Sequence, residues 1–461
     1  MRPDASPQDY TPQTYTPGSV RVHGATLAGM AAAARLAKAG HHVVLDSAGL
    51  PDAGHWAAQS QLGVEVDEMP QTFLLPAAWR DLLKKSGRAF DVELQRHHLA
   101  LVPAPAQRHL FADGRELTLP TERGEQVAAV SDAFGRRAAL AWTTLLDELD
   151  ELWQHLRMAG LERPVGPDGF DRATRRALLA DTSLDQLAER AGDPHLARLV
   201  RSQGALNGAA PGRNPALLAV RLAVQRRFGS WQLVDTSTPE RPLPVRASRL
   251  VDLLTERLEL RGVQRVGAPE ALLGSGLPEL GSRDTPGGAD AVLDALPRLP
   301  ASRWGLAPAR PAMAPTVRHR IVEDLEQPDE PGFDELGLDG SGIVEVVDHR
   351  SGAPVVTWHR PLPDGRVVRT SHDHTRPRPD LAWGLAPSTW RAWRQRCGLG
   401  GDGSWHASAS SPAGGEPWAE LLSGALAVYE IHQELTGTDI RPTNRTPPRQ
   451  ARSPRPAASR G

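Results

Sequence analysis

The fold is decided by one stretch, VRVHGATLAGMAAAARLAKAGHHVVLD at residues 20–46. Alternating valines predict a short strand at 20–23, and the alanine-rich segment 25–39 predicts a helix because it holds the strongest helix formers. Gly40 follows where a left-handed helix cap is favoured, and 42–46 is a second apolar strand. Because the connection is short, we expect the two strands to be parallel, joined by a right-handed crossover.

The turn after the first strand departs from the glycine pattern of dinucleotide-binding folds. Such a turn uses glycine three times: for the tight turn, for close approach of phosphate, and for helix–strand packing. Gly24 and Gly29 supply the first and third, whereas Thr26 takes the place of the second. The Thr26 side chain crowds the space of a pyrophosphate, although its hydroxyl is able to hydrogen-bond a phosphate oxygen. The helix start at Ala25, Thr26 and Leu27 still offers free amides and a positive dipole end to an anion.

An acidic residue ends the second strand. Asp46 stands 22 residues after Gly24, where a carboxylate accepts the ribose hydroxyls of a dinucleotide. Together with the strand, the helix and Gly40, it favours an α/β fold with a Rossmann-like FAD/NAD(P)-binding domain. The alternative is a strand–helix–strand unit with two unrelated glycines.

The whole chain has the composition of an ordinary soluble protein. Its 461 residues exceed one compact core, so two or three domains are expected. A formal net charge of -2 excludes nucleic acid as a partner by electrostatics. The single cysteine, Cys397, excludes an intramolecular disulfide and a cysteine-based zinc site. No secretory signal and no membrane-spanning apolar run is seen, so a cytoplasmic location is expected.

The remaining segments alternate between helical and β-rich character. We expect a dinucleotide-binding domain interleaved with an α+β substrate domain, a mixed sheet plus helices, between two disordered tails. The first domain is assigned to 18–62, 241–300 and 400–440, the second to 63–240 and 301–399, and the tails to 1–17 and 441–461.

Four later segments resemble one flavoprotein family, the phytoene desaturase branch of the FAD-dependent amine-oxidase-type oxidoreductases. The resemblance covers nearly everything from Val20 to Gly437. The similar segments are VEVDEMPQTFLLPAAWRDLLKKSG (64–87), LFADGRELTLPTERGEQVAAVSDAFG (110–135), PALLAVRLAVQRRFGSWQL (215–233) and ASASSPAGGEPWAELLSGALAVYEIHQELTG (407–437).

This resemblance implies an FAD cofactor and hydride transfer from an apolar, isoprenoid-type substrate to flavin. It places the backbone of Gly414, Gly415 and Glu416 beside the flavin ring. Because flavin carries the chemistry, no catalytic residue is assigned. Peripheral contact with a membrane is compatible with such a substrate, and no oligomeric state is predicted.

Cofactor-facing positions depart from the family pattern at four places, each toward a larger residue. Besides Thr26, Gly49 and Gly54 are isolated where the family has a glycine pair after the ribose acid, and Met69 replaces a glycine. The segment TPERPLPVRASRL (238–250) lacks a double glycine. These departures predict weak or lost FAD binding and leave two alternatives open. One is a non-catalytic relative acting as a binding or assembly module, and the other is an NAD(P)-binding dehydrogenase.

Two further groups of residues have alternative interpretations. The segment SHDHTRP at 371–377 places His372 and His374 on one side of a strand. They are interpreted either as solvent-facing residues of a sheet edge or as a pair of metal ligands without a third ligand. We predict no metal site. The tryptophans that crowd the C-terminal third serve as core residues or line an apolar substrate tunnel: Trp383, Trp390, Trp393, Trp405 and Trp418.

Overall fold

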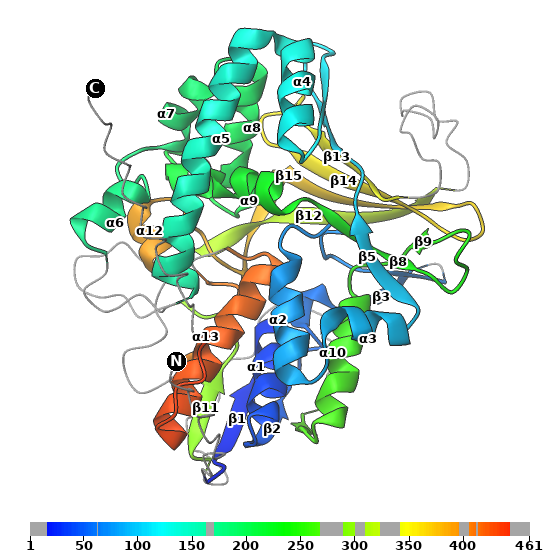
Figure 1. Ribbon diagram of the computed structural model, residues 1–461, viewed down its shortest axis with the longest axis vertical. Helices are drawn as coiled ribbons and strands as arrows, with labels where there is room; N and C mark the ends of the chain where they lie inside the picture. The colour runs from blue at the N-terminus through cyan, green and yellow to red at the C-terminus, as the bar shows by residue number, and fades with distance from the viewer. Residues whose placement is uncertain are drawn as a thin grey trace, which may run out of the picture.

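The computed structural model describes residues 16–61, 63–162, 170–267, 289–299, 309–322, 342–395, 405–411 and 414–442. Most of both predicted tails, and Cys397, lie outside these residues. Within them, two lobes form around two sheets (Figure 1). None of the described helices is both long and apolar enough to cross a membrane.

The first part of the chain alternates strands and helices. Its elements are β1 (Ser19–His23), α1 (Leu27–Lys38), β2 (His42–Asp46), η1 (Gly54–Trp56), β3 (Gln59–Gln61), β4 (Val64–Val66), α2 (Pro76–Ser86), α3 (Phe90–Arg96), β5 (Leu99–Pro103), β6 (Gln107–Leu110) and β7 (Glu116–Leu119). The predicted strand–helix–strand unit at 20–46 is confirmed by β1, α1 and β2.

The middle part is helical, as its apolar periodicity predicts. Its elements are α4 (Arg123–Phe134), α5 (Arg136–Leu156), η2 (Arg157–Leu161), α6 (Arg172–Ala177), α7 (Leu184–Ala188), η3 (Glu189–Ala191), α8 (Pro194–Leu206), η4 (Ala216–Ala219) and α9 (Val220–Phe228). These helices share a hydrophobic core of their own, centred on leucines of α5.

The last part returns to strands before a long final helix. Its elements are β8 (Trp231–Asp235), β9 (Leu243–Pro244), α10 (Arg249–Leu260), β10 (Gln264–Val266), β11 (Ala291–Asp294), β12 (Pro311–Val322), β13 (Val344–Asp348), β14 (Val355–Pro361), β15 (Val367–Leu385), α12 (Trp390–Gln395), β16 (Trp405–His406) and α13 (Pro417–Thr436).

A parallel sheet of five strands, in the order β10–β2–β1–β11–β16, forms the lower lobe of Figure 1. From β1 the chain goes first to β2 on one side and much later to β11 on the other. Ligands of open α/β sheets bind at such a switch point, beyond the carboxyl ends of the strands. The predicted α/β fold class is therefore confirmed, whereas the exact domain boundaries stay a prediction.

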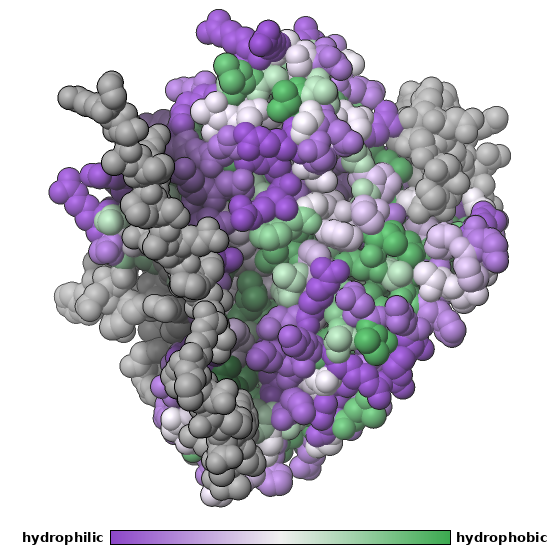
Figure 2. Space-filling model, viewed as in Figure 1, coloured by the Kyte–Doolittle hydropathy of each residue, from purple (hydrophilic) through white to green (hydrophobic). Residues whose placement is uncertain are grey.

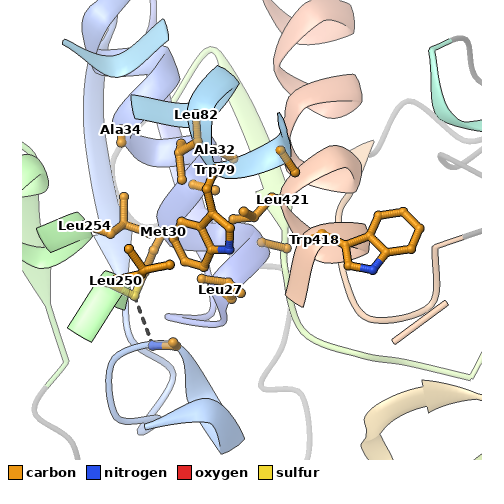
Figure 3. Close-up of a cluster of buried hydrophobic side chains, with 14 of the residues drawn as sticks. Leu27, Met30, Ala32, Ala34, Trp79, Leu82, Leu250, Leu254, Trp418 and Leu421 are labelled. Carbon is orange, nitrogen blue, oxygen red and sulfur yellow. Dashed lines mark hydrogen bonds between the residues drawn. The ribbon is translucent and has the colours of Figure 1, made fainter. Parts of the chain in front are cut away.

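Helix α1 lies at the centre of the lower lobe, because its alanines let three other helices approach closely. All residues from Leu27 to Leu36 are buried. Gly424 of α13 is one such approach, since a Cβ there would lie 2.7 Å from the Ala28 carbonyl oxygen. Figure 3 shows the side chains around Met30 of α1, which come from α2, α10 and α13: Trp79, Leu82, Leu250, Leu254 and Leu421.

The second sheet has six strands in the order β12–β15–β14–β13–β6–β7 and separates the helical middle part from the lower lobe. Because β15 pairs with β12 on one side and β14 on the other, it is a central strand. The prediction that His372 and His374 face solvent on a sheet edge is thus wrong, since both are buried. Figure 2 shows a mainly hydrophilic face with small hydrophobic patches, one over β5 and β8.

Candidate cofactor site

The turn between β1 and α1 needs glycine at both places where the sequence has it. Gly24 has a φ of +108°, a conformation that L-residues with a side chain rarely adopt. A Cβ at Gly29 would lie 2.1 Å from the Gly24 carbonyl oxygen and 2.8 Å from the Ala295 Cβ. These two glycines therefore preserve the close helix–strand packing of a dinucleotide-binding turn.

Thr26 has an ordinary structural role in this turn. Its φ of -68° and ψ of 165° are those of a helix N-cap, so the threonine fits this turn without backbone strain. Its hydroxyl accepts a hydrogen bond from the Gly29 amide (3.2 Å) and donates one to the Ala295 carbonyl (3.0 Å). The hydroxyl is thus occupied within the protein, rather than directed at a phosphate.

Asp46, the predicted ribose acceptor, is held by a cation from the neighbouring strand. The Arg21 guanidinium donates to its carboxylate at 2.6 Å, and the Ala48 amide donates at 3.1 Å. Burial opposes ionisation of Asp46, but these donors outweigh it and hold the pKa of the carboxyl below its usual value. A ribose hydroxyl would have to share this carboxylate with Arg21.

The loop after β2 covers the start of α1. Ala53 forms a parallel bridge with Thr26, and its amide contacts the Met30 sulfur at 3.0 Å, the dashed line in Figure 3. Ala53 and Gly54 have φ values of 64° and 63°. The loop therefore keeps the left-handed backbone that a glycine pair would favour, although alanine stands at the first of the two positions.

Two other departures from the family pattern meet at one buried carboxylate. Asp67 accepts hydrogen bonds from the Met69 amide (3.0 Å) and from the Ser248 amide (3.0 Å) and hydroxyl (2.5 Å). Ser248 precedes α10, in the segment that lacks the double glycine. These substitutions thus belong to a satisfied hydrogen-bond network that links the loop at Asp67 to α10.

The space at the start of α1 is filled by Trp56 and Glu420. The Trp56 indole N–H donates to a Glu420 carboxyl oxygen at 2.7 Å, and the nearby Ala28 amide favours the ionised form of the same carboxyl group. The two residues are 1% and 2% exposed. Burial raises the pKa of Glu420 to about 8, although both donors work in the opposite direction.

The predicted flavin-facing residues lie at the start of α13. A Cβ at Gly415 would lie 2.8 Å from the Trp383 carbonyl oxygen, and Gly414 has a φ of +115°. The Glu416 carboxylate receives hydrogen bonds from Arg221 and from the Trp418 indole, both at 2.6 Å. The helix start is therefore closed in by the Trp383 backbone of β15 and the Arg221 side chain of α9.

A cavity of about 50 Å³ remains between the two lobes. Its walls include three tryptophans, the Arg221–Glu416 ion pair and the two histidines of β15: Trp56, Trp358, Trp383, His372 and His374. Burial lowers the pKa of His372 to about 3 and that of His374 to about 4, so both imidazoles are neutral near pH 7.

This arrangement of side chains does not accommodate FAD. Pockets for drug-sized ligands have volumes of about 300–1,000 Å³, and FAD belongs to the large end of that range. The cavity of about 50 Å³ is much smaller, and the start of α1 is occupied by Trp56 and Glu420. The glycines and helices of a dinucleotide site are thus present, but within the described residues the start of α1 is occupied by Trp56 and Glu420.

Sequence comparison relates part of the chain to carotenoid desaturases. The chain is 31% identical to hydroxyneurosporene desaturase of Cereibacter sphaeroides over 224 residues, 46% of this chain and 44% of that protein. It is 30% identical to phytoene dehydrogenase of Streptomyces griseus over 207 residues, 44% of this chain and 40% of that protein. The chain thus matches less than half the length of these relatives. No protein-family model matches it.

Solved structures share the fold over nearly the whole chain. Putrescine oxidase bound to putrescine has 14% identity and a TM-score of 0.53, covering 90% of this chain and 99% of its own. Cyclohexylamine oxidase from Brevibacterium oxydans also has 14% identity, with a TM-score of 0.51, covering 90% and 100%. The resemblance to the carotenoid desaturase and amine oxidase superfamily is confirmed by these comparisons.

Sequence reasoning missed three residues that decide the state of this site: Arg21, Trp56 and Glu420. Arg21 is a charged residue between the two valines of β1, next to the strand that ends at Asp46. Glu420 is an acid in the apolar first part of α13. Both are detectable as charges at positions where burial is expected, whereas nothing in the local sequence pairs Glu420 with Trp56.

Proposed function

We propose that this chain is an FAD-dependent oxidoreductase of the phytoene desaturase type, which oxidises an apolar, isoprenoid-like substrate by hydride transfer. The observation that carries the proposal is the sequence similarity to two carotenoid desaturases. The fold supports it, because the parallel sheet, α1 and α13 have the arrangement of a dinucleotide-binding domain.

The proposed cofactor positions are those named from the sequence. The phosphates would be held at the start of the first helix, by Gly24, Ala25, Thr26, Leu27 and Gly29. The ribose would be held by Asp46 at the end of the second strand. The flavin would lie at the start of the last helix, beside Gly414, Gly415 and Glu416. Because FAD does not fit the present arrangement, the proposal requires Trp56 and Glu420 to move away before the cofactor enters.

The cavity supports an apolar substrate class. Trp358 and Trp383 give it aromatic walls, and the imidazoles of His372 and His374 are neutral. A site that holds a hydride acceptor benefits from such walls, because they exclude water from the reacting atoms. We further propose a cytoplasmic protein that reaches a membrane-dissolved substrate by peripheral contact.

The test is the absorption spectrum of the purified protein. A bound flavin gives a yellow protein and is released as free FAD on denaturation. Protein that is colourless, and remains so after incubation with FAD and gel filtration, contradicts the proposed function.

A second candidate is a non-catalytic relative that keeps the flavoprotein fold as a binding or assembly module. It is favoured by the filled site, in which the Thr26 hydroxyl, Asp46 and Glu420 all have partners within the protein. The same spectrum separates the two candidates, because this relative would stay colourless at any FAD concentration.

A further inference from the structure

The two helices that frame the predicted cofactor site lie side by side, with the start of α1 against the second turn of α13. Helices α1 and α13 pack side by side along their length, as Figure 1 shows. Their closest approach brings Gly424 against the Ala28 carbonyl. Glu420 lies one turn before Gly424, and therefore next to the first turn of α1. The positive dipole end of α1 therefore lies near this carboxyl group.

Glu420 places a carboxyl oxygen beside the first turn of α1, where a dinucleotide-binding fold places a phosphate oxygen. The first amides of a helix have no partner within the helix and bind anions when one is present. Here the Ala28 amide lies close enough to the Glu420 carboxyl group to lower its pKa. An acidic oxygen from α13 thus stands where the diphosphate of a dinucleotide binds in this fold.

Trp56 completes the occupation of this space. Its ring is 1% exposed, and its indole N–H holds Glu420 at 2.7 Å. The ring also lies against two others, with centroid distances of 3.9 Å to His55 and 5.1 Å to Trp383. Because His55 belongs to η1 and Trp383 to β15, the indole joins the loop after β2 to the central strand of the second sheet.

We propose that Trp56 and Glu420 form a built-in occupant of the dinucleotide site, which competes with the diphosphate of FAD for the start of α1. This inference rests on the proposed function, since it assigns the control of FAD affinity to these two side chains. The competition has two components. The side chains fill the volume, and a diphosphate placed there would face the carboxyl group of Glu420 instead of free amides.

The test compares dinucleotide binding by three variants with that of the wild type. Glu420→Ala removes the occupying carboxyl group. Glu420→Gln keeps its shape and hydrogen-bond acceptor but cannot ionise. Glu434→Gln is the matched control, because it removes a carboxylate from the far end of the same helix, away from the site. Calorimetric titration with FAD, and separately with ADP as the diphosphate half of the cofactor, gives the affinities, and circular dichroism checks that each variant is folded.

We expect Glu420→Ala to bind both FAD and ADP at least about tenfold more tightly than the wild type, a factor that corresponds to about 1.4 kcal/mol. We expect Glu420→Gln to show a smaller gain and Glu434→Gln to show none. If Glu420→Ala does not fold, the affinities for FAD and ADP are measured on Glu420→Gln and on the double variant Glu420→Gln/Trp56→Phe. Both variants nearly conserve the side-chain volume.

The outcomes separate this inference from the proposed function. Equal, tight FAD binding by the wild type and Glu420→Ala overturns the inference and leaves the function intact. A gain for ADP without FAD binding supports the inference and contradicts the function, because the phosphate end opens while the flavin has no place. No gain for either probe in a folded variant overturns the inference.

Discussion

Replacing Glu420 with glutamine should change the pH dependence of stability. Burial raises the pKa of Glu420 to about 8 from an ordinary value of 4.5. The folded protein therefore holds a proton that the unfolded chain releases above its lower pKa. This contribution to stability is fully present below about pH 4.5 and is lost as the pH rises through about 8.

The size of the effect follows from the pKa difference. Each pKa unit corresponds to about 1.36 kcal/mol of unfolding free energy. The shift of the Glu420 pKa from 4.5 to about 8 therefore contributes about 5 kcal/mol at low pH, of which about 3 kcal/mol is lost by pH 7. A glutamine at this position would carry no proton equilibrium, and its side-chain oxygen would still accept from the Trp56 indole. We therefore expect Glu420→Gln to match the wild type within about 1 kcal/mol at pH 4.5 and to exceed its stability by several kcal/mol at pH 8.

The assay is urea unfolding of both proteins at pH 4.5, 6.5 and 8 in the same buffer salt, followed by tryptophan fluorescence. The difference between variant and wild type is the quantity of interest, because it cancels the other titrating groups. Glu434→Gln, which changes an exposed glutamate of the same helix, is measured beside it as the control. A flat difference for Glu420→Gln would refute the reasoning, since it would mean that the folded protein does not hold the proton at Glu420.

Three further substitutions test the turn and the loop that surround the site. Gly29→Ala should cost several kcal/mol of stability or prevent folding, because there is no space for the added Cβ. Its control, Gly352→Ala, should change the unfolding midpoint little, since nothing lies within 4 Å of the added atom. Thr26→Gly should lower the free energy of unfolding by about 1 kcal/mol, seen as a lower melting temperature, because the Thr26 hydroxyl caps the helix. For the same reason, this substitution should not tighten FAD binding by itself. Ala53→Gly should gain about 1 kcal/mol in thermal unfolding, because it relieves a φ of 64°; an unchanged melting temperature would argue against strain at this residue.

The sequence alone determines the architecture of the lower lobe, because that architecture depends on short-range preferences. Valines at alternate positions make β1, alanines make α1, and Gly24 and Gly29 make the turn between them. The similarity to carotenoid desaturases is likewise readable from the sequence. These features are readable because hydrophobic periodicity and glycine positions act over a few residues.

Only the tertiary structure decides what fills the site, because its contacts join residues far apart in the chain. Thr26 bonds to Ala295, 269 residues away, and Trp56 bonds to Glu420, 364 residues away. His372, expected at an edge, is buried because β12 and β14 pair on both sides of its strand. A local pattern fixes the conformation of a segment. Whether a buried amide meets a phosphate or a carboxyl group of the same chain depends on which distant side chain the fold brings to it.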